Sequence, residues 1–154
     1  MPIQLIHPAL VHFPIVFVIS LLAVDVYAVW RGVPLTPHSG LGRASIILTA
    51  LAALSAIAAF IFGDRAFDIA LAAGTPEAVL EPHEQMGTMT TAFIAGWAVL
   101  RGLAFWRQLA IGTLLAGGVV LAEVVLVGLI LTTALYGGQL VYEHGVGVIA
   151  HSAG

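Results

Sequence analysis

The stretch HPALVHFPIVFVISLLAVDVYAVW, residues 7–30, decides how this chain folds. Between Leu10 and Trp30 its one acidic or basic side chain other than histidine is Asp25. A helix needs about 20 predominantly apolar residues to cross a lipid bilayer, so this stretch predicts a membrane-spanning helix. Its start is unusual, because two histidines and two prolines stand together where the chain enters lipid, at positions 7, 8, 12 and 14.

The composition extends this conclusion to the whole chain. Of its 154 residues, 60% are hydrophobic and only 8% are charged, and the mean hydropathy is +1.07. A soluble domain of this size would carry about a quarter charged residues. Lipid is therefore the solvent for most of the chain.

Charge and cysteine content exclude several classes of function. The net charge is -3, with five arginines and no lysine, so the basic patch that a nucleic acid partner requires is missing. There is no cysteine, which excludes disulfides, thiolate metal sites, iron–sulfur clusters and covalently attached c-type haem.

Four apolar stretches predict four spans within a single domain, 1–154. The spans run from about 10–30, 41–62, 85–105 and 109–136. No cleavable signal peptide is recognisable, so the first span is expected to stay as a membrane anchor. Between the second and third spans, 65–73 is expected to form a short interfacial helix that Gly74 and Pro76 end. Short connections favour an all-α, up-down four-helix bundle.

The arginines predict the orientation of this bundle. Arg31, Arg43, Arg101 and Arg107 flank the first and third connections, whereas Arg65 is alone among acidic residues in the second. Cationic residues favour cytoplasmic loops. We therefore expect a multi-pass protein of the bacterial inner membrane, with both termini on the outer, periplasmic side.

With this topology, histidines from three separate stretches meet at one membrane face. His7 and His12 lie at the outer start of the first span, His83 lies at the outer start of the third, and His144 follows the outer end of the fourth. His38 lies in the opposite, inner connection, and His151 lies beyond His144. A lone histidine at this depth is most often a polar residue among the lipid headgroups, but four from separate stretches predict a binding site.

The motifs that carry these histidines resemble a known family. HPxxVHFP at the start, a histidine followed by Gly87 before the third span, and YGGxLVYxHGxGV at the end are similar to a widespread bacterial family of four-span membrane proteins of unknown function. Members of that family occur fused to Rieske iron–sulfur domains, which implies redox work. The resemblance implies His7, His12, His83 and His144 as its histidines, and a Rieske partner of this cysteine-free chain would be a separate protein.

The first functional hypothesis is haem b. Haem iron in a helical bundle takes an axial nitrogen from each side, and we expect His12 and His83 to supply this pair. His7 and His144 would bind a second haem, the propionates or the edge of the site, and Arg65 would pair with a propionate. The chain would then pass electrons at the outer face between a quinol or another membrane donor and an external redox protein, as an oxidoreductase component.

Two alternatives stay open. Three or four imidazoles also suit copper or zinc. The chain could instead be a structural subunit of a larger redox complex, in which the histidines only bind backbone groups. The expected partners are the lipid bilayer, other redox proteins or further copies of this chain, and a quinone.

Two acids inside the spans form a second candidate site. Asp25 and Glu123 lie at a similar depth on the inner half, and Arg101 approaches the same level. Carboxylates inside a membrane are usually paired or functional. The favoured interpretation is a salt bridge that locks the helices together, and the alternative is a proton or quinone site.

Overall fold

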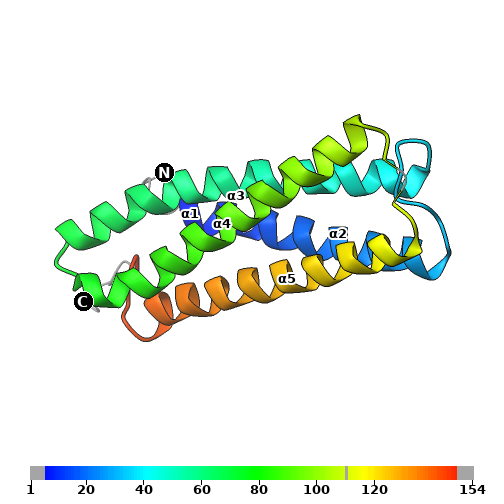
Figure 1. Ribbon diagram of the computed structural model, residues 1–154. Coiled ribbons are helices and arrows are strands. Elements are labelled where there is room, and N and C mark those ends of the chain that lie inside the picture. The colour runs from blue at the N-terminus through cyan, green and yellow to red at the C-terminus, as the bar shows by residue number, and fades with distance from the viewer. Residues whose placement is uncertain (1–5, 110, 149–154) are drawn as a thin grey trace.

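The computed structural model describes residues 6–109 and 111–148, and within these ranges every regular element is an α-helix. Figure 1 shows four long helices running side by side, preceded by one short helix. In chain order the elements are α1 (Ile6–Leu10), α2 (His12–Trp30), α3 (Gly40–Ala72), α4 (Glu77–Trp106) and α5 (Thr113–Tyr142). The predicted all-α class is confirmed.

Four stretches are long and apolar enough to cross a membrane, and they follow the order of the predicted spans. Their bounds are Ile6–Trp30, Gly40–Ala72, Glu77–Trp106 and Leu115–Tyr142. At the end where polar residues follow, each helix continues past the bound predicted for its span. The sequence bounds followed hydropathy, whereas the backbone hydrogen bonds of a helix continue into water once packing has formed it.

The first span is interrupted near its start. Pro14 has no N–H to donate to the carbonyl of Leu10, and α1 ends at Leu10. The backbone nitrogen of Val11 still donates to the carbonyl of His7 at 3.1 Å, so α2 follows α1 almost without a turn. Val11 between them keeps helical torsions, φ -61° and ψ -22°, so His7 and His12 keep the angular spacing of a continuous helix.

The expected interfacial helix at 65–73 is wrong, because α3 continues unbroken to Ala72. Its 33 residues extend about 50 Å, more than the roughly 30 Å of hydrocarbon in a bilayer. Gly74 then takes a φ of 94°, a conformation that glycine adopts readily, and Pro76 begins α4. The α3–α4 hairpin is therefore longer than the hydrocarbon layer is thick.

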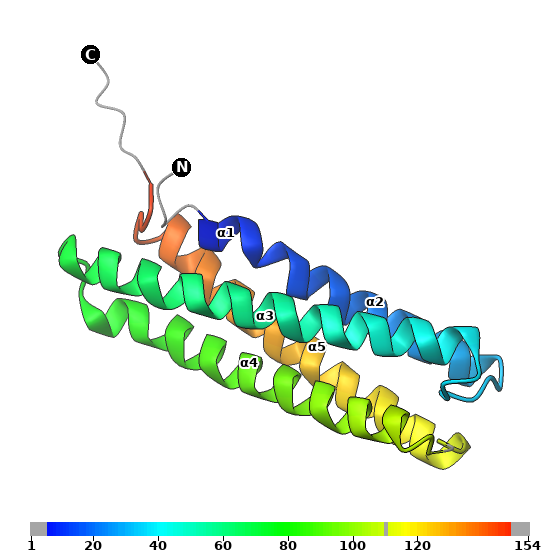
Figure 2. The same cartoon turned by 90° about the horizontal axis from the view of Figure 1, so that it is seen from above.

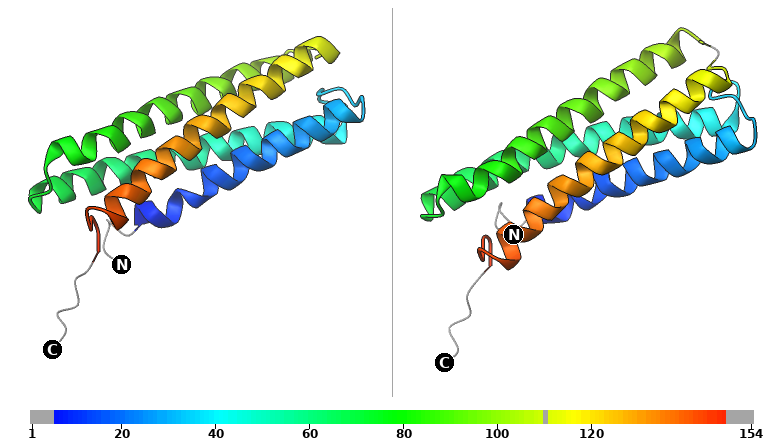
Figure 3. Two further views of the ribbon diagram at one scale, coloured as in Figure 1. Left: turned by 90° about the horizontal axis from the view of Figure 1, so that it is seen from below. Right: turned by 60° about the horizontal axis from the view of Figure 1, so that its bottom comes forward.

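The four long helices form a ring in which each contacts two neighbours. α2 and α4 each pack against both α3 and α5, and Figures 2 and 3 show the resulting up-down bundle. We call the end that holds α1, the α3–α4 turn and the last turn of α5 the hairpin end. The other end, with the connections 31–39 and 107–112, is the arginine end.

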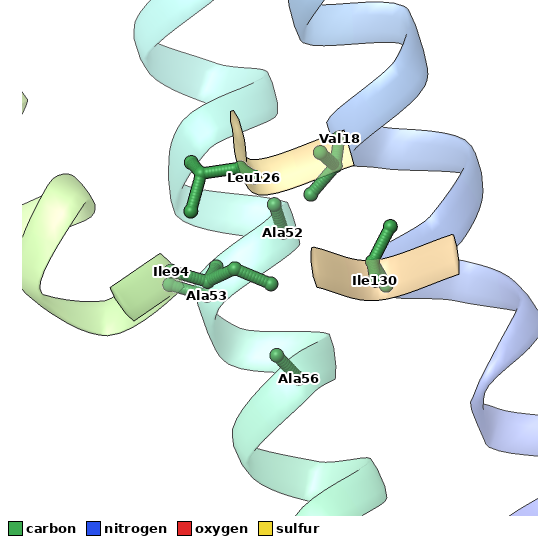
Figure 4. Close-up of a cluster of buried hydrophobic side chains, with 7 residues drawn as sticks. All are labelled: Val18, Ala52, Ala53, Ala56, Ile94, Leu126 and Ile130. Atoms are coloured by element: carbon green, nitrogen blue, oxygen red, sulfur yellow. The ribbon is translucent and has the colours of Figure 1, made fainter. Parts of the chain in front are cut away.

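The centre of the bundle is an apolar layer drawn from all four long helices (Figure 4). Small side chains on α3 let the larger side chains of the other helices approach closely, as is common where helices pack in lipid. We call this group the central layer, and its buried members are Val18, Ala52, Ala53, Ala56, Ile94, Leu126 and Ile130.

The outside of the bundle is also apolar. Leu54 and Leu121 each expose 66% of their surface, and Trp30 and Trp106 expose 75% and 74% at the arginine end. Water-soluble monomers rarely expose contiguous apolar surface on this scale, whereas tryptophans are enriched at membrane interfaces. The chain is a multi-pass membrane protein whose outer surface faces the lipid bilayer.

Arg31, Arg43 and Arg107 lie at the arginine end, but Arg101 does not belong to a connection. It lies inside α4, and only 6% of its surface is exposed. The arginine end therefore has three arginines, and not the four expected, whereas Arg65 is the single arginine expected at the hairpin end.

Candidate functional site

His7 is fixed by the helix beside it. Its Nδ1 lies 2.8 Å from the carbonyl oxygen of Ala59 in α3. A carbonyl oxygen can only accept, so Nδ1 carries the hydrogen, and in the neutral ring Nε2 is left with a lone pair. Metal-binding histidines in proteins are commonly oriented by such a bond.

His83 is held in the same way on the opposite side of the bundle. Its Nδ1 lies 3.0 Å from the carbonyl oxygen of Thr133 in α5, so its Nε2 also keeps a lone pair. The hydroxyl of Thr133 donates to the carbonyl of Leu129 at 2.9 Å and lies 2.8 Å from the hydroxyl of Thr90. This network fixes α4 and α5 against each other just below His83.

The two rings meet at the hairpin end. Their centroids are 6.0 Å apart, and their planes make an angle of 73°. Both side chains are half-buried. Each ring is tied to one neighbouring helix, so the bundle holds two imidazoles against each other with a nitrogen lone pair on each.

A glycine makes room for each ring. A Cβ atom at Gly63 in α3 would lie 2.9 Å from Cε1 of His7, and one at Gly137 in α5 would lie 2.9 Å from Cε1 of His83. Real Cβ atoms essentially never approach a neighbour so closely. The absence of a side chain at both positions is therefore part of the site.

These contacts repeat between the two halves of the chain. His7 and His83 are 76 positions apart, while their partners Ala59 and Thr133 are 74 apart, as are Gly63 and Gly137. The α1–α3 half and the α4–α5 half thus build the same arrangement, one imidazole on one helix bound to the next. The histidine pair lies where the two halves meet.

The expected pairing of His12 with His83 is not what the structure has. The side chain of His12 is exposed, and His7 faces His83 instead. Five residues turn an α-helix by about 500°, or 140° past a full turn, so His7 and His12 cannot share one face. The inward face near the start of the bundle belongs to His7.

The other expected ligands lie outside the pair. Arg65 and His144 are both exposed. His144 nevertheless lines a pocket of about 190 Å³ together with His83, Tyr136 and Gln139. His38 lies at the opposite end, where its Nε2 is 3.2 Å from Oε1 of Gln108, and His151 lies outside the described residues.

The grouping of the donors limits which metal could bind. Among the described residues, no three histidines and acids lie close enough together to hold an ion. Structural zinc takes four protein ligands and catalytic zinc takes three. A pair of imidazoles on opposite helices instead matches haem iron, for which the porphyrin supplies the remaining nitrogens.

A second polar cluster lies nearer the arginine end. Nη1 of Arg101 is 2.8 Å from Oδ2 of Asp25 and 3.2 Å from Oε1 of Glu123, and Nη2 donates to the hydroxyl of Ser45. The structure thus brings together the three charged residues singled out in the sequence. We call Asp25, Arg101 and Glu123 the charged triad.

Sequence reasoning missed Ser45, the two glycines and the carbonyl partners of the histidines. The sequence did contain a usable signal for the pairing of the two histidines. The histidines of HP at 7–8 and PH at 82–83 are 76 residues apart, the same spacing as Asp25 and Arg101. That repeat would have paired His7, and not His12, with His83.

Comparison with known proteins gives a family but no relative of known activity. No curated protein and no solved structure matches the chain. A family model described as a predicted membrane protein, DUF2231, matches residues 4–150. This match covers nearly all of the chain, including both histidines of the pair and the charged triad. The chain belongs to the DUF2231 family of membrane proteins.

Proposed function

We propose that this chain is a b-type cytochrome-like electron-transfer protein of the bacterial inner membrane, with haem b held between His7 and His83. The observation that carries the proposal is the pair of imidazoles, 6.0 Å apart, each with Nδ1 bound to a carbonyl and Nε2 left as a ligand. Two imidazole nitrogens on facing helices are the protein ligands that haem iron takes in a helical bundle.

Haem iron would supply the chemistry, accepting one electron and giving it up again. The residues of the chain would do the rest. His7 and His83 would hold the iron from two helices, and their bonds to Ala59 and Thr133 would keep the rings from turning. Fixed ligands of this kind suit electron transfer, because the geometry changes little between the two oxidation states.

The position of the pair supports a role at the membrane surface. About 20 helical residues cross the hydrocarbon layer, and counted from Trp30 and Trp106 they end near Leu10 and Met86. The histidines lie just past these residues, at the hairpin end. Arg31, Arg43 and Arg107 favour the cytoplasm for the opposite end. The pair would then face the periplasm, where an external redox protein could accept electrons from a quinol or another membrane donor.

One observation favours a second candidate, a single copper or zinc ion. The pocket beside His83 holds about 190 Å³, which is smaller than a porphyrin, so haem would require the helices to separate at the hairpin end. A bare ion would fit without that movement. His144 lines the same pocket as His83, and its exposed side chain would have to turn toward the pair to serve as a third ligand.

The test is the visible spectrum of the full chain purified in detergent from cells supplied with haem precursor. The proposal expects a Soret band that shifts on reduction with dithionite. His7→Ala and His83→Ala should each lose or strongly weaken the band, because each removes one of the two nitrogens that would hold the iron. His12→Ala is the matched control and should keep the wild-type spectrum, since its side chain points away from the pair.

Metal analysis of the same samples separates the candidates. A colourless protein with one copper or zinc ion per chain, lost in His83→Ala and His144→Ala, would establish the second candidate and overturn the first. A colourless protein that binds no metal under any loading condition would overturn both.

A further inference from the structure

The charged triad is buried at a depth where water is scarce. Asp25 and Glu123 expose none of their surface, and Arg101 exposes 6%. The central layer separates the triad from the histidine pair on every long helix. A second apolar group, built around Ala28 and Val119, lies on the side of the arginine end.

The charges of the triad do not balance. It contains two acids and one guanidinium, and arginine remains protonated in proteins. The other polar side chains that surround it are Ser45, Thr49 and Trp97, none of which supplies a charge. With both acids ionised, the bundle would carry one uncompensated negative charge inside the membrane, which costs several kcal/mol.

The hydrogen bonds are incomplete in the same place. Oδ2 of Asp25 and Oε1 of Glu123 both accept from the same nitrogen, Nη1 of Arg101, so the two carboxyl groups lie side by side. Their other oxygens, Oδ1 of Asp25 and Oε2 of Glu123, are buried without a partner, and so is Nε1 of the adjacent Trp97. Buried polar atoms almost always find one.

We propose that Asp25 and Glu123 hold one proton between them, which makes the charged triad a buried proton-binding site. A protonated carboxyl is a donor and its ionised neighbour is an acceptor, so one proton removes the excess charge and satisfies an orphaned oxygen. Paired carboxyls that share a proton are a known arrangement in active sites. The inference is independent of what His7 and His83 bind.

Infrared spectroscopy of the full chain tests this directly. The protein is measured at neutral pH in a maltoside detergent, which has no ester carbonyl to obscure the carboxylic acid region. Wild type should show one protonated carboxyl band that moves to lower frequency after exchange into D₂O. Labelling with side-chain ¹³C-carboxyl aspartate and glutamate should shift the same band and identify it without any substitution.

Single variants distinguish a shared proton from an unrelated one. Asp25→Asn and Glu123→Gln each leave one acid opposite Arg101, so that acid should ionise and the band should vanish in both. Glu81→Gln removes an exposed acid in the first turns of α4 and should leave the band unchanged. Both triad variants should keep the helical circular dichroism and the monodisperse elution of wild type.

Three results would overturn the proposal. The first is a wild-type spectrum without a protonated carboxyl band, in protein whose isotope-labelled carboxylates all absorb as ionised groups. The second is a band that survives in either single variant. The third is a band that neither the labelled aspartate nor the labelled glutamate shifts, because the protonated group would then lie outside the triad.

Discussion

At the scale of single residues, the site depends on where side chains are missing as much as on where they are present. The rings of His7 and His83 fill space beside Gly63 and Gly137. Each ring is also tied by Nδ1 to a backbone carbonyl, so it cannot move without losing that bond. A methyl group at either glycine would therefore displace the histidine ring beside it before it disturbs the fold.

Gly137→Ala is expected to displace His83 and weaken cofactor binding at least tenfold, with the helical content unchanged. The new Cβ would lie 2.9 Å from Cε1 of the ring, and relieving that contact breaks or lengthens the bond to Thr133. Titration of the apoprotein with haem, or with copper or zinc if the protein proves colourless, measures the loss.

Gly138→Ala provides the matched control, because nothing lies within 4 Å of the Cβ that it would add. This variant should bind its cofactor as wild type does, and it also raises the helix propensity of α5 slightly. Equal weakening in both variants would contradict the role assigned to Gly137.

The sequence predicts the residues of this site better than their directions. Histidine near the start of two spans was sufficient to predict that histidines gather at one end of the bundle, as His7 and His83 do. Which of His7 and His12 faces inward depends on how α1 packs against α3, where Nδ1 of His7 meets the carbonyl oxygen of Ala59. The local pattern does not contain that packing, and the sequence offers only the 76-residue spacing that His7 and His83 share with Asp25 and Arg101.

At the scale of elements, the ends of the helices explain where the sequence bounds fell short. Hydropathy ends the second span near Phe62, but α3 continues to Ala72 through Asp64, Arg65 and Asp68. Its partner α4 extends equally far, so the two helices support each other beyond the lipid. Hydropathy predicts where the apolar stretch ends. The helix itself ends where a residue such as Gly74 adopts a non-helical conformation.

The start of α3 is fixed by a cap. Oγ of Ser39 accepts from the backbone nitrogen of Gly42 at 2.9 Å and donates to the carbonyl of Pro34 at 2.6 Å. A side chain at Gly42 would overlap the backbone of Thr36. The α2–α3 connection is therefore a closely packed turn at the arginine end.

Ser39→Ala is expected to lower the free energy of unfolding by about 1 kcal/mol, the usual effect of losing an N-cap. The histidine pair lies at the other end of the bundle, so cofactor binding should be unchanged. Chemical or thermal unfolding in detergent measures the first quantity, and cofactor titration measures the second. A loss of binding as large as that in Gly137→Ala would contradict this separation of the two ends.

At the scale of the whole molecule, the chain consists of two helical halves that build similar structures. Positions 76 apart in the first helix of each half, and 74 apart in the second, take equivalent places around the histidines. The triad breaks the equivalence, because Asp25 in one half stands where Arg101 stands in the other. The two similar halves thus contact each other through His7 and His83 at the hairpin end, and through the opposite charges of Asp25 and Arg101 nearer the arginine end.

This arrangement predicts that the chain can be divided at the α3–α4 turn. Fragments 1–74 and 75–154, expressed together, should associate in the membrane and co-purify through a tag on either one. Because each fragment supplies one histidine of the pair, only the complex should bind the cofactor. His83→Ala in the second fragment should abolish that binding without preventing association. Full binding by one fragment alone would contradict a site shared between the halves.

The central layer has a consequence for the cell. Acidic and basic groups at two depths could give protons a route across the membrane and short-circuit its electrochemical gradient. Val18, Ala56 and Leu126 belong to the buried apolar layer between those depths. Electrons can tunnel through such a barrier over short distances, but hydrated ions cannot enter it. The bundle can therefore hold ionisable chemistry on both sides of its middle while the membrane stays sealed.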